Sequence, residues 1–310
     1  MSLVSTSVDR GRDRRTIAVI INPISGGRGR PDVARRRAEQ AAAVIASASR
    51  ASLVSVTERA GHAHDLARAA VAGGADVVVA WGGDGTVNEV ASALARTPAA
   101  LAIVPGGSGN GLARELGVPW DPAHALRLAL GTSSRVIDAG ELDGRLFVNV
   151  AGIGLDARVA HGFAGSTRRG LRRYAEVTLR ELRRYVPVPY VVTLDEAPPF
   201  ETVPLLIAIA NSRQYGNGAI IAPAARIDDG RLDVVVVEHR SPLAVLWQMP
   251  RLFLGQVERL PGVRVGTSQQ VRVSALEPIP CHVDGEPFLG SATVSARVLP
   301  GVLRVMVAEG

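Results

Sequence analysis

Residues 76–89 read Asp76-Val-Val-Val-Ala-Trp-Gly-Gly-Asp-Gly-Thr-Val-Asn-Glu89, a short apolar run followed by glycines around a single acid. The run from Asp76 to Trp81 is typical of a buried strand, and the segment that follows the glycines is typical of a helix. A glycine-rich turn between a strand and a helix directs several backbone N–H groups, and the positive end of the helix dipole, at one point. The stretch therefore predicts a phosphate-binding turn in an α/β domain.

Asp84 lies among those amides and would repel a phosphate if it stood alone, whereas a magnesium ion between the carboxylate and the phosphate oxygens removes the repulsion. The alternative is an ordinary tight turn in which Asp84 caps the helix. We favour the phosphate site because two more glycine-rich loops, Asn22 to Gly27 and Pro105 to Gly111, also follow predicted strands. The carboxyl ends of parallel strands share one edge of a sheet, where ligands bind in such folds.

The order of the predicted elements divides the chain in two. Short apolar runs first alternate with helices, which indicates a parallel sheet covered on both faces, and from Val136 onward most elements are strands, which indicates an antiparallel β-sandwich. We predict a disordered basic tail over 1–15, an α/β domain over 16–139 and a sandwich domain over 140–310. Strands are expected at 16–22, 52–57, 76–81, 101–104, 147–150, 190–194, 203–211, 232–238, 271–274, 293–298 and 303–307, and helices at 31–48, 62–72, 85–96, 111–116, 122–130, 168–186 and 241–254.

Composition excludes several classes of protein. All 35 basic residues are arginine, so a lysine-type phosphate loop, a protein kinase fold and a Schiff-base enzyme are excluded. The single cysteine, Cys281, excludes an internal disulfide and is expected to be a small buried residue. Apolar runs are strand-sized, so we expect a soluble, cytoplasmic protein. The net charge of +6 is compatible with nucleic acid, an anionic membrane or phosphorylated substrates, but an aromatic content of 4% argues against nucleic acid.

Five motifs in this order resemble the diacylglycerol kinase catalytic domain family, which includes bacterial lipid kinases and the sphingosine and ceramide kinases. They are Asn22 to Gly27, Gly82 to Glu89, Pro105 to Arg114, Ala222 to Asp233 and Val283 to Pro287. The resemblance spans nearly the whole chain beyond the tail. It implies an ATP-binding α/β domain, with a nucleotide site like that of NAD kinases and phosphofructokinases, and then a β-sandwich. Gly111 stands where many bacterial members carry an acid, so the third motif is more similar to the sphingosine and ceramide kinase variant.

The resemblance also implies roles for individual residues. The nucleotide-binding positions are Asn22, Thr57, Gly82, Gly83, Asp84, Gly85, Thr86, Asn88 and Ser108. Asp84 is linked to Mg²⁺, and Arg226, Asp229 and Arg231 hold a metal ion. Asp84, Asp284 and Glu286 are catalytic, with Glu286 as the proton acceptor.

These roles imply transfer of the γ-phosphate of ATP to the hydroxyl of a lipid, such as diacylglycerol or a sphingoid base, at a membrane surface. The alternatives are a non-catalytic lipid-binding protein of the same fold and an NAD kinase-like phosphotransferase. The sequence is also compatible with a homodimer. Two carboxylates on a turn beside a cleft can supply the base that such a transfer needs, although Asp-Gly is also a common signal of a plain hairpin.

Two further stretches have competing interpretations. Arg168 to Val186 predicts a basic amphipathic helix, which either contacts an anionic bilayer or packs its apolar face on the sandwich with a solvated arginine face. Gly152 to Ala157 imitates a dinucleotide fingerprint, but it lies outside the alternating block and is interpreted as a structural turn. His62 and His64 are two residues apart and therefore do not predict a metal pair on one helix face.

Overall fold

The computed structural model describes residues 15–26, 31–47, 52–163, 171–216, 218–239, 251 and 253–308. The first elements are β1 Ile17–Ile21, α1 Pro31–Ser47, β2 Ser52–Val56, α2 His62–Ala72, β3 Val77–Gly82, α3 Asp84–Leu94, β4 Ala100–Pro105, α4 Gly111–Glu115 and α5 Pro122–Leu130. They are followed by β5 Ser134–Leu142, β6 Arg145–Phe147, β7 Val150–Gly154, α6 Leu155–Phe163, α7 Leu171–Arg184, β8 Tyr190–Leu194, β9 Phe200–Thr202, β10 Pro204–Ala210, β11 Gln214–Gly216 and β12 Ala219–Ile220. The last are β13 Leu232–Glu238, a 3₁₀ turn Val257–Arg259, β14 Val263–Ser268, β15 Gln270–Ser274, β16 Pro280–Val283, β17 Glu286–Leu289 and β18 Thr293–Met306.

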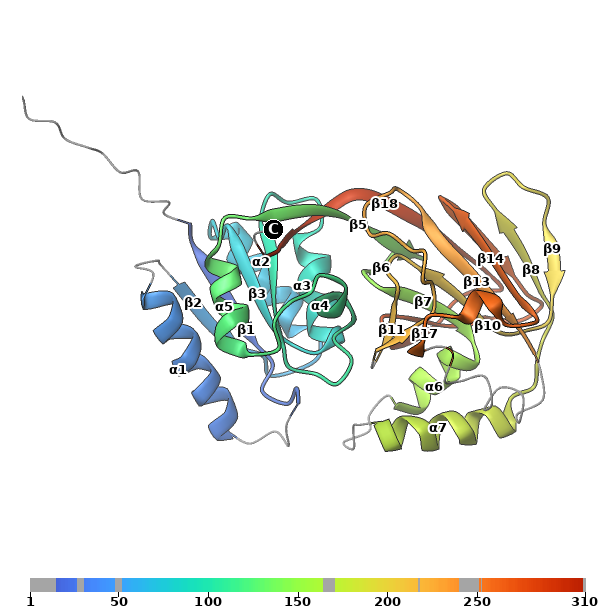
Figure 1. Cartoon of the computed structure of the whole chain (residues 1–310), viewed down its shortest axis with the longest axis horizontal. Helices are drawn as coiled ribbons and strands as arrows, with labels where there is room; N and C mark the ends of the chain where they lie inside the picture. The colour runs from blue at the N-terminus through green and yellow to red at the C-terminus, as the bar shows by residue number, and fades with distance from the viewer. Residues whose placement is uncertain are drawn as a thin grey trace, which may run out of the picture.

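The first domain is a parallel sheet with helices on both sides (Figure 1). Its strands run in the order β2-β1-β3-β4, and every residue of β1, β3 and β4 is buried. Strands that are buried on both faces consist of continuous apolar residues, so these strands could be predicted from the sequence. The predicted α/β class is confirmed.

The second domain is an antiparallel sandwich, as predicted. One face is the sheet β14-β13-β10-β7-β16-β17, and the other is formed by β18, β15, β8 and β9 with β5 and β6. Side chains of both sheets share one core, in which Phe147, Val192, Ile207 and Val294 are buried. Cys281 is fully buried in the same core, and this burial raises the pKa of its thiol to about 12.

Strand β18 joins the two domains. It pairs with β15 and β5 in the sandwich, and Arg304 and Val305 then pair with β4 of the first domain, so one sheet continues through both (Figure 1). The two strands expected at 293–298 and 303–307 are therefore one strand, with a register shift between Leu299 and Leu303. Residues 299–306, assigned by sequence to the second domain, contribute Leu299, Val302, Leu303, Val305 and Met306 to the core of the first.

Two other expectations differ in detail. The strand expected at 147–150 is the end of β6 and the start of β7, with a bend between them. Most of the helix expected at 241–254 lies outside the described residues. The same holds for all but the last residue of the tail expected at 1–15. None of the described helices combines the length and the apolar character needed to cross a bilayer.

Candidate active site

The three glycine-rich loops meet at one edge of the parallel sheet. Gly106 N–H donates to the Gly82 carbonyl at 2.8 Å, and a Cβ placed on Gly107 would lie 2.8 Å from the Gly83 Cα. Only glycine permits so close an approach of two backbones. The first loop joins them because Asn22 Nδ2 donates to Thr86 Oγ1 at 2.8 Å. The prediction that the three loops meet at one edge of the sheet is therefore confirmed.

Asp84 ties the second loop to the third. Its Oδ2 accepts from Asn110 N–H at 2.9 Å and its Oδ1 from Gly111 N–H at 2.7 Å. The N-cap of α3 is Gly83, so the alternative interpretation, in which Asp84 caps α3, is wrong. The carboxylate instead lies at the N-terminus of α4, where free N–H groups and the helix dipole attract negative charge.

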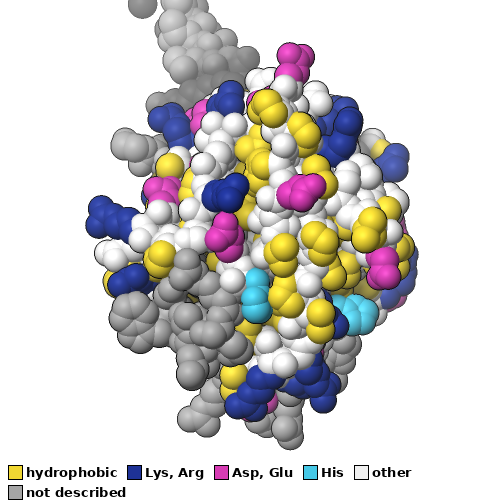
Figure 2. Space-filling model, turned by 90° about the vertical axis from the view of Figure 1, so that its right-hand side faces the viewer, with side chains coloured by type: hydrophobic (Ala, Val, Ile, Leu, Met, Phe, Trp, Pro, Cys, Tyr) yellow, Lys and Arg dark blue, Asp and Glu magenta, His cyan; other side chains and the backbone are white. Residues whose placement is uncertain are grey.

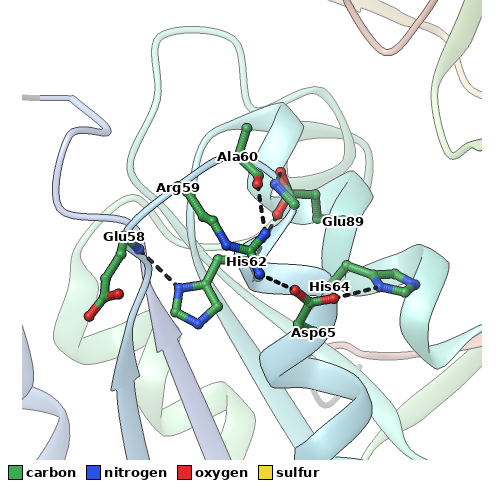
Figure 3. Close-up of polar contacts among 9 residues, drawn as sticks. Glu58, Arg59, Ala60, His62, His64, Asp65 and Glu89 are labelled. Carbon is green, nitrogen blue, oxygen red and sulfur yellow. Dashed lines mark hydrogen bonds and ion pairs between the residues drawn. The ribbon is translucent and has the colours of Figure 1, made fainter.

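Glu89, the last residue of the second motif, extends the network to the loop after β2 (Figure 3). Its carboxylate accepts from Gly61 N–H at 2.8 Å and Ala63 N–H at 3.0 Å, which holds the start of α2. Thr57 N–H donates to the Ile21 carbonyl at 2.9 Å, so Thr57 is placed beside the end of β1. The predicted nucleotide positions Asn22 and Thr57 thus lie at neighbouring strand ends.

The histidines of this region have separate partners. His62 Nδ1 accepts from Glu58 N–H at 3.1 Å, whereas His64 faces Asp65 at 3.7 Å (Figure 3). Asp65 also pairs with Arg59 at 2.6 Å, and this hydrogen bond lowers the pKa of the Asp65 carboxyl. In the described part of the chain, no three His, Cys, Asp or Glu side chains are close enough together to hold a metal ion.

The Asp-Gly-Glu sequence is a tight turn between β16 and β17. Asp284 has φ +46° and Gly285 has φ +87°, so both central residues are left-handed, as in the hairpin turns that match strand twist. The Asp284 carboxylate accepts from Val148, Asn149 and Val150 N–H at 2.8, 2.9 and 3.1 Å and from Asn88 Nδ2 at 2.8 Å. Burial raises the pKa of Asp284, and these hydrogen bonds oppose the shift. Asp284 and Asn88 therefore anchor the turn to the other domain.

Glu286 is exposed and faces the glycine-rich turn across the cleft. A Cβ placed on Gly85 would lie 2.9 Å from Glu286 Oε1, so the carboxylate lies against the first turn of α3. The cleft between the domains has a volume of about 400 Å³. Of the predicted residues it is lined by Gly83, Asp84, Gly85, Ser108, Asp284 and Glu286.

The predicted metal-binding turn lies away from this lining. Asp229 Oδ1 accepts from Arg231 N–H at 3.0 Å, and Gly230 N–H donates to the buried Asp138 at 2.7 Å. The side chain of Arg226 faces Asp228 at 3.7 Å. The structure thus brings the second, third and fifth motifs together at the cleft, and the first motif bonds to the second through Asn22 and Thr86. The Asp229 turn is a separate feature.

Among the cleft residues that escaped the sequence analysis, three have titratable side chains: Asp156, Tyr215 and His282. His282 Nε2 is 3.1 Å from Asp156 Oδ2, which also accepts from the Tyr215 hydroxyl at 2.8 Å. Asp156 belongs to the Gly152–Ala157 stretch that was interpreted as a structural turn. The available signals were a carboxylate directly after a strand and a histidine two residues before Asp284.

Comparison with known proteins agrees with the two-domain fold. Residues 16–142 match the diacylglycerol kinase catalytic domain, and residues 149–307 match the YegS C-terminal NAD kinase beta sandwich-like domain. The chain is 38% identical to a Pseudomonas aeruginosa protein named "Probable lipid kinase YegS-like", over 88% of this chain and 90% of that protein. It is 33% identical to the "Diacylglycerol kinase" of Mycobacterium tuberculosis, over 79% and 82% of the two chains. A crystal structure of a diacylglycerol kinase from Bacillus anthracis has the same fold, with a TM-score of 0.70, 20% identity and coverage of 95% and 97%.

Proposed function

Because the chain belongs to the diacylglycerol kinase catalytic domain family, we propose that it is a lipid kinase that transfers the γ-phosphate of ATP to a lipid hydroxyl. One observation carries the proposal: the exposed carboxylate of Glu286, from the second domain, faces the phosphate-type turn at Gly85, from the first. Phosphoryl transfer needs a phosphate cradle and a base on opposite sides of the reacting atoms. The cleft supplies both.

The cradle is formed by backbone amides rather than by cationic side chains. The first N–H groups of an α-helix have no partner within the helix, and the dipole adds partial positive charge there. In this chain the start of α3 and the Gly107–Gly109 loop both line the cleft. We expect the β- and γ-phosphates to lie between them, with the rest of the nucleotide toward Asn22, Thr57 and Ser108.

Asp84 fits a place beside the magnesium ion that accompanies ATP. Each of its carboxylate oxygens accepts one backbone N–H and retains a lone pair that is free for a cation. Mg²⁺ prefers such oxygen ligands, and when bound it neutralises charge on the phosphate oxygens. We also propose that the Asp229 carboxylate, with the main-chain oxygens of Arg226 and Arg231, holds a cation, because this is an all-oxygen set of the kind that hard cations prefer.

Glu286 is the base in this proposal. It accepts the proton of the lipid hydroxyl as the oxygen attacks the γ-phosphorus, and the bond to the β-phosphate oxygen breaks. In the described part of the chain no donor bonds to the Glu286 carboxylate, so it is available to the acceptor. The acceptor then enters from the sandwich side of the cleft, past α6.

We propose that the enzyme acts while bound at a membrane surface. Val177 and Leu182 of α7 are buried against α6, whereas Arg180, Arg183 and Arg184 are exposed. The packed interpretation of this helix is thus confirmed for the described side chains, and its arginine face is left for anionic lipid. Figure 2 shows basic side chains gathered at the lower edge of the sandwich end, where α7 lies in Figure 1.

The test is a screen with radiolabelled ATP and Mg²⁺ against diacylglycerol, monoacylglycerol, sphingosine, ceramide and undecaprenol in mixed micelles. We expect label in at least one lipid, and its loss in Glu286→Ala but not in Glu201→Ala, which alters an exposed carboxylate on β9. NAD and a sugar phosphate are included as acceptors. Label in either of these and in no lipid would overturn the proposal, and so would the absence of transfer to every acceptor.

A further inference from the structure

Asp156, His282 and the half-buried Tyr215 form a polar cluster that contacts the turn carrying Glu286. Asp156 and His282 are 8% and 6% exposed, and both line the inner end of the cleft. Asp156 Oδ2 accepts from the Tyr215 hydroxyl, and Oδ1 accepts from Ala157 N–H at 2.8 Å. A buried carboxylate with this many donors is held in one orientation.

His282 connects this cluster to the turn. Gly285 N–H donates to His282 Nδ1 at 3.2 Å, so this ring nitrogen carries no proton. The neutral imidazole then has its proton on Nε2, which donates to Asp156 Oδ2 at 3.1 Å. The donor and acceptor roles are consistent along the whole series from Tyr215 to the Gly285 amide.

Gly152 of β7 makes room for the pair. It lies opposite His282 in the sheet, and a Cβ there would be 2.0 Å from Asp156 Oδ2 and 2.3 Å from His282 Nε2. Any side chain at position 152 would therefore separate the two groups. This packing explains why a glycine stands four residues before Asp156, in the stretch that imitates a dinucleotide motif.

The turn is held from both sides of its central peptide. On one side Asp284 N–H donates to the Val150 carbonyl at 2.9 Å, and the Asp284 carboxylate binds the other domain. On the other side, within the described part of the chain, the Gly285 N–H donates to His282 Nδ1. Because Glu286 follows Gly285 directly, the orientation of this peptide sets the direction of its side chain.

We propose that His282 and Asp156 are positioning residues, which hold the Gly285 amide so that the Glu286 carboxylate faces the phosphate-binding turn. The inference rests on the proposed kinase function only for its effect on turnover. Displacing a reacting group by about 1 Å can lower a rate about 100-fold, so the expected loss is in kcat and not in nucleotide binding.

The experiment compares two substitutions, each of which keeps a hydrogen-bonding group near the place of one of the two ring nitrogens. His282→Asn retains an oxygen near the place of Nδ1 and can still accept from Gly285, whereas His282→Gln retains an amide near Nε2 and can bond only to Asp156. We measure kcat, KM for MgATP and the hydrogen exchange of the assigned Gly285 amide by NMR. His161→Asn and His161→Gln, at an exposed position of α6, are the matched controls.

We expect His282→Gln to lower kcat about 10- to 100-fold with KM for MgATP within about twofold of wild type, and to speed Gly285 exchange. His282→Asn should retain most of the turnover and of the amide protection. Equal losses in both variants, or unchanged Gly285 exchange in His282→Gln, would overturn the inference. If His282→Gln does not fold, Tyr215→Phe must give a smaller loss of kcat in the same direction, and no change there would also overturn it.

Failure of the kinase proposal is distinguishable from failure of this inference. If the wild-type protein phosphorylates no lipid, the proposed function is wrong, but Gly285 exchange in the two His282 variants still decides whether the histidine holds the turn.

Discussion

At the scale of single residues, the two acids of the Asp-Gly-Glu turn have different surroundings. Asp284 accepts four hydrogen bonds from N–H groups, whereas Glu286 is exposed in the cleft opposite Gly85. A carboxylate with every favourable direction occupied is suited to holding structure, and one that is open to the cleft is suited to exchanging protons. We therefore propose an anchoring role for Asp284 and the chemical role for Glu286.

Replacing Glu286 with alanine should lower kcat by about 100- to 10,000-fold, the usual range for loss of a general base. Because Glu286 accepts no hydrogen bond from the described residues, the melting temperature should change little. Steady-state kinetics and thermal melting of the same preparation check both statements. Turnover within a factor of three of wild type would remove Glu286 from the mechanism.

At the scale of elements, the turn between β16 and β17 is predicted to depend on Asp284 for its stability. Asp284→Asn places an NH₂ group among N–H donors, and we expect it to lower the free energy of unfolding by about 2–4 kcal/mol. Asp195→Asn is the matched control, because Asp195 also has a positive φ, of +50°, and accepts from Gln269 and Gln270 N–H, but at an exposed turn. Chemical denaturation measures both. A fully stable but inactive Asp284→Asn would instead indicate a direct chemical role.

The helix α7 should bring its arginines to anionic lipid. Reversing the charge at Arg183 and Arg184 should weaken binding to vesicles that contain anionic lipid by at least about 30-fold at low salt, since each arginine near such a surface contributes about 1 kcal/mol. Arg35→Glu with Arg36→Glu on α1, in the other domain, is the control pair. Vesicle sedimentation gives the affinities. Binding that is indifferent to lipid charge would exclude this face as the membrane contact.

At the scale of the whole molecule, strand β18 belongs to both domains. It contributes side chains to both cores, and β5 pairs with it along most of its length. Unfolding either core therefore disrupts the strand on which the other depends. We expect calorimetry to show one transition with equal calorimetric and van't Hoff enthalpies. Two resolved transitions would show that the domains unfold independently.

The sequence alone determined the elements from β1 to α5 and the glycine-rich side of the site. Most predicted helices and strands lie within a few residues of observed ones, because apolar periodicity and glycine positions are local properties of the chain. The elements β5, α6 and β14 had no predicted counterpart. The convergence of the loops after β1, β3 and β4 also followed, since parallel strands end at one edge of their sheet. The position of Glu286 opposite these loops was not given by any local pattern and was implied only by the resemblance to the family.

Only the tertiary structure decided what holds that cleft in shape. The Asn88–Asp284 bond joins residues 196 positions apart, and the Asp156–His282 bond joins residues 126 positions apart. No local pattern specifies such pairs, because they depend on the register of β7 with β16 and on β18 crossing between the domains. Short motifs indicated which chemical groups the cleft contains, whereas the geometry of the cleft depends on hydrogen bonds between residues that are distant in the sequence.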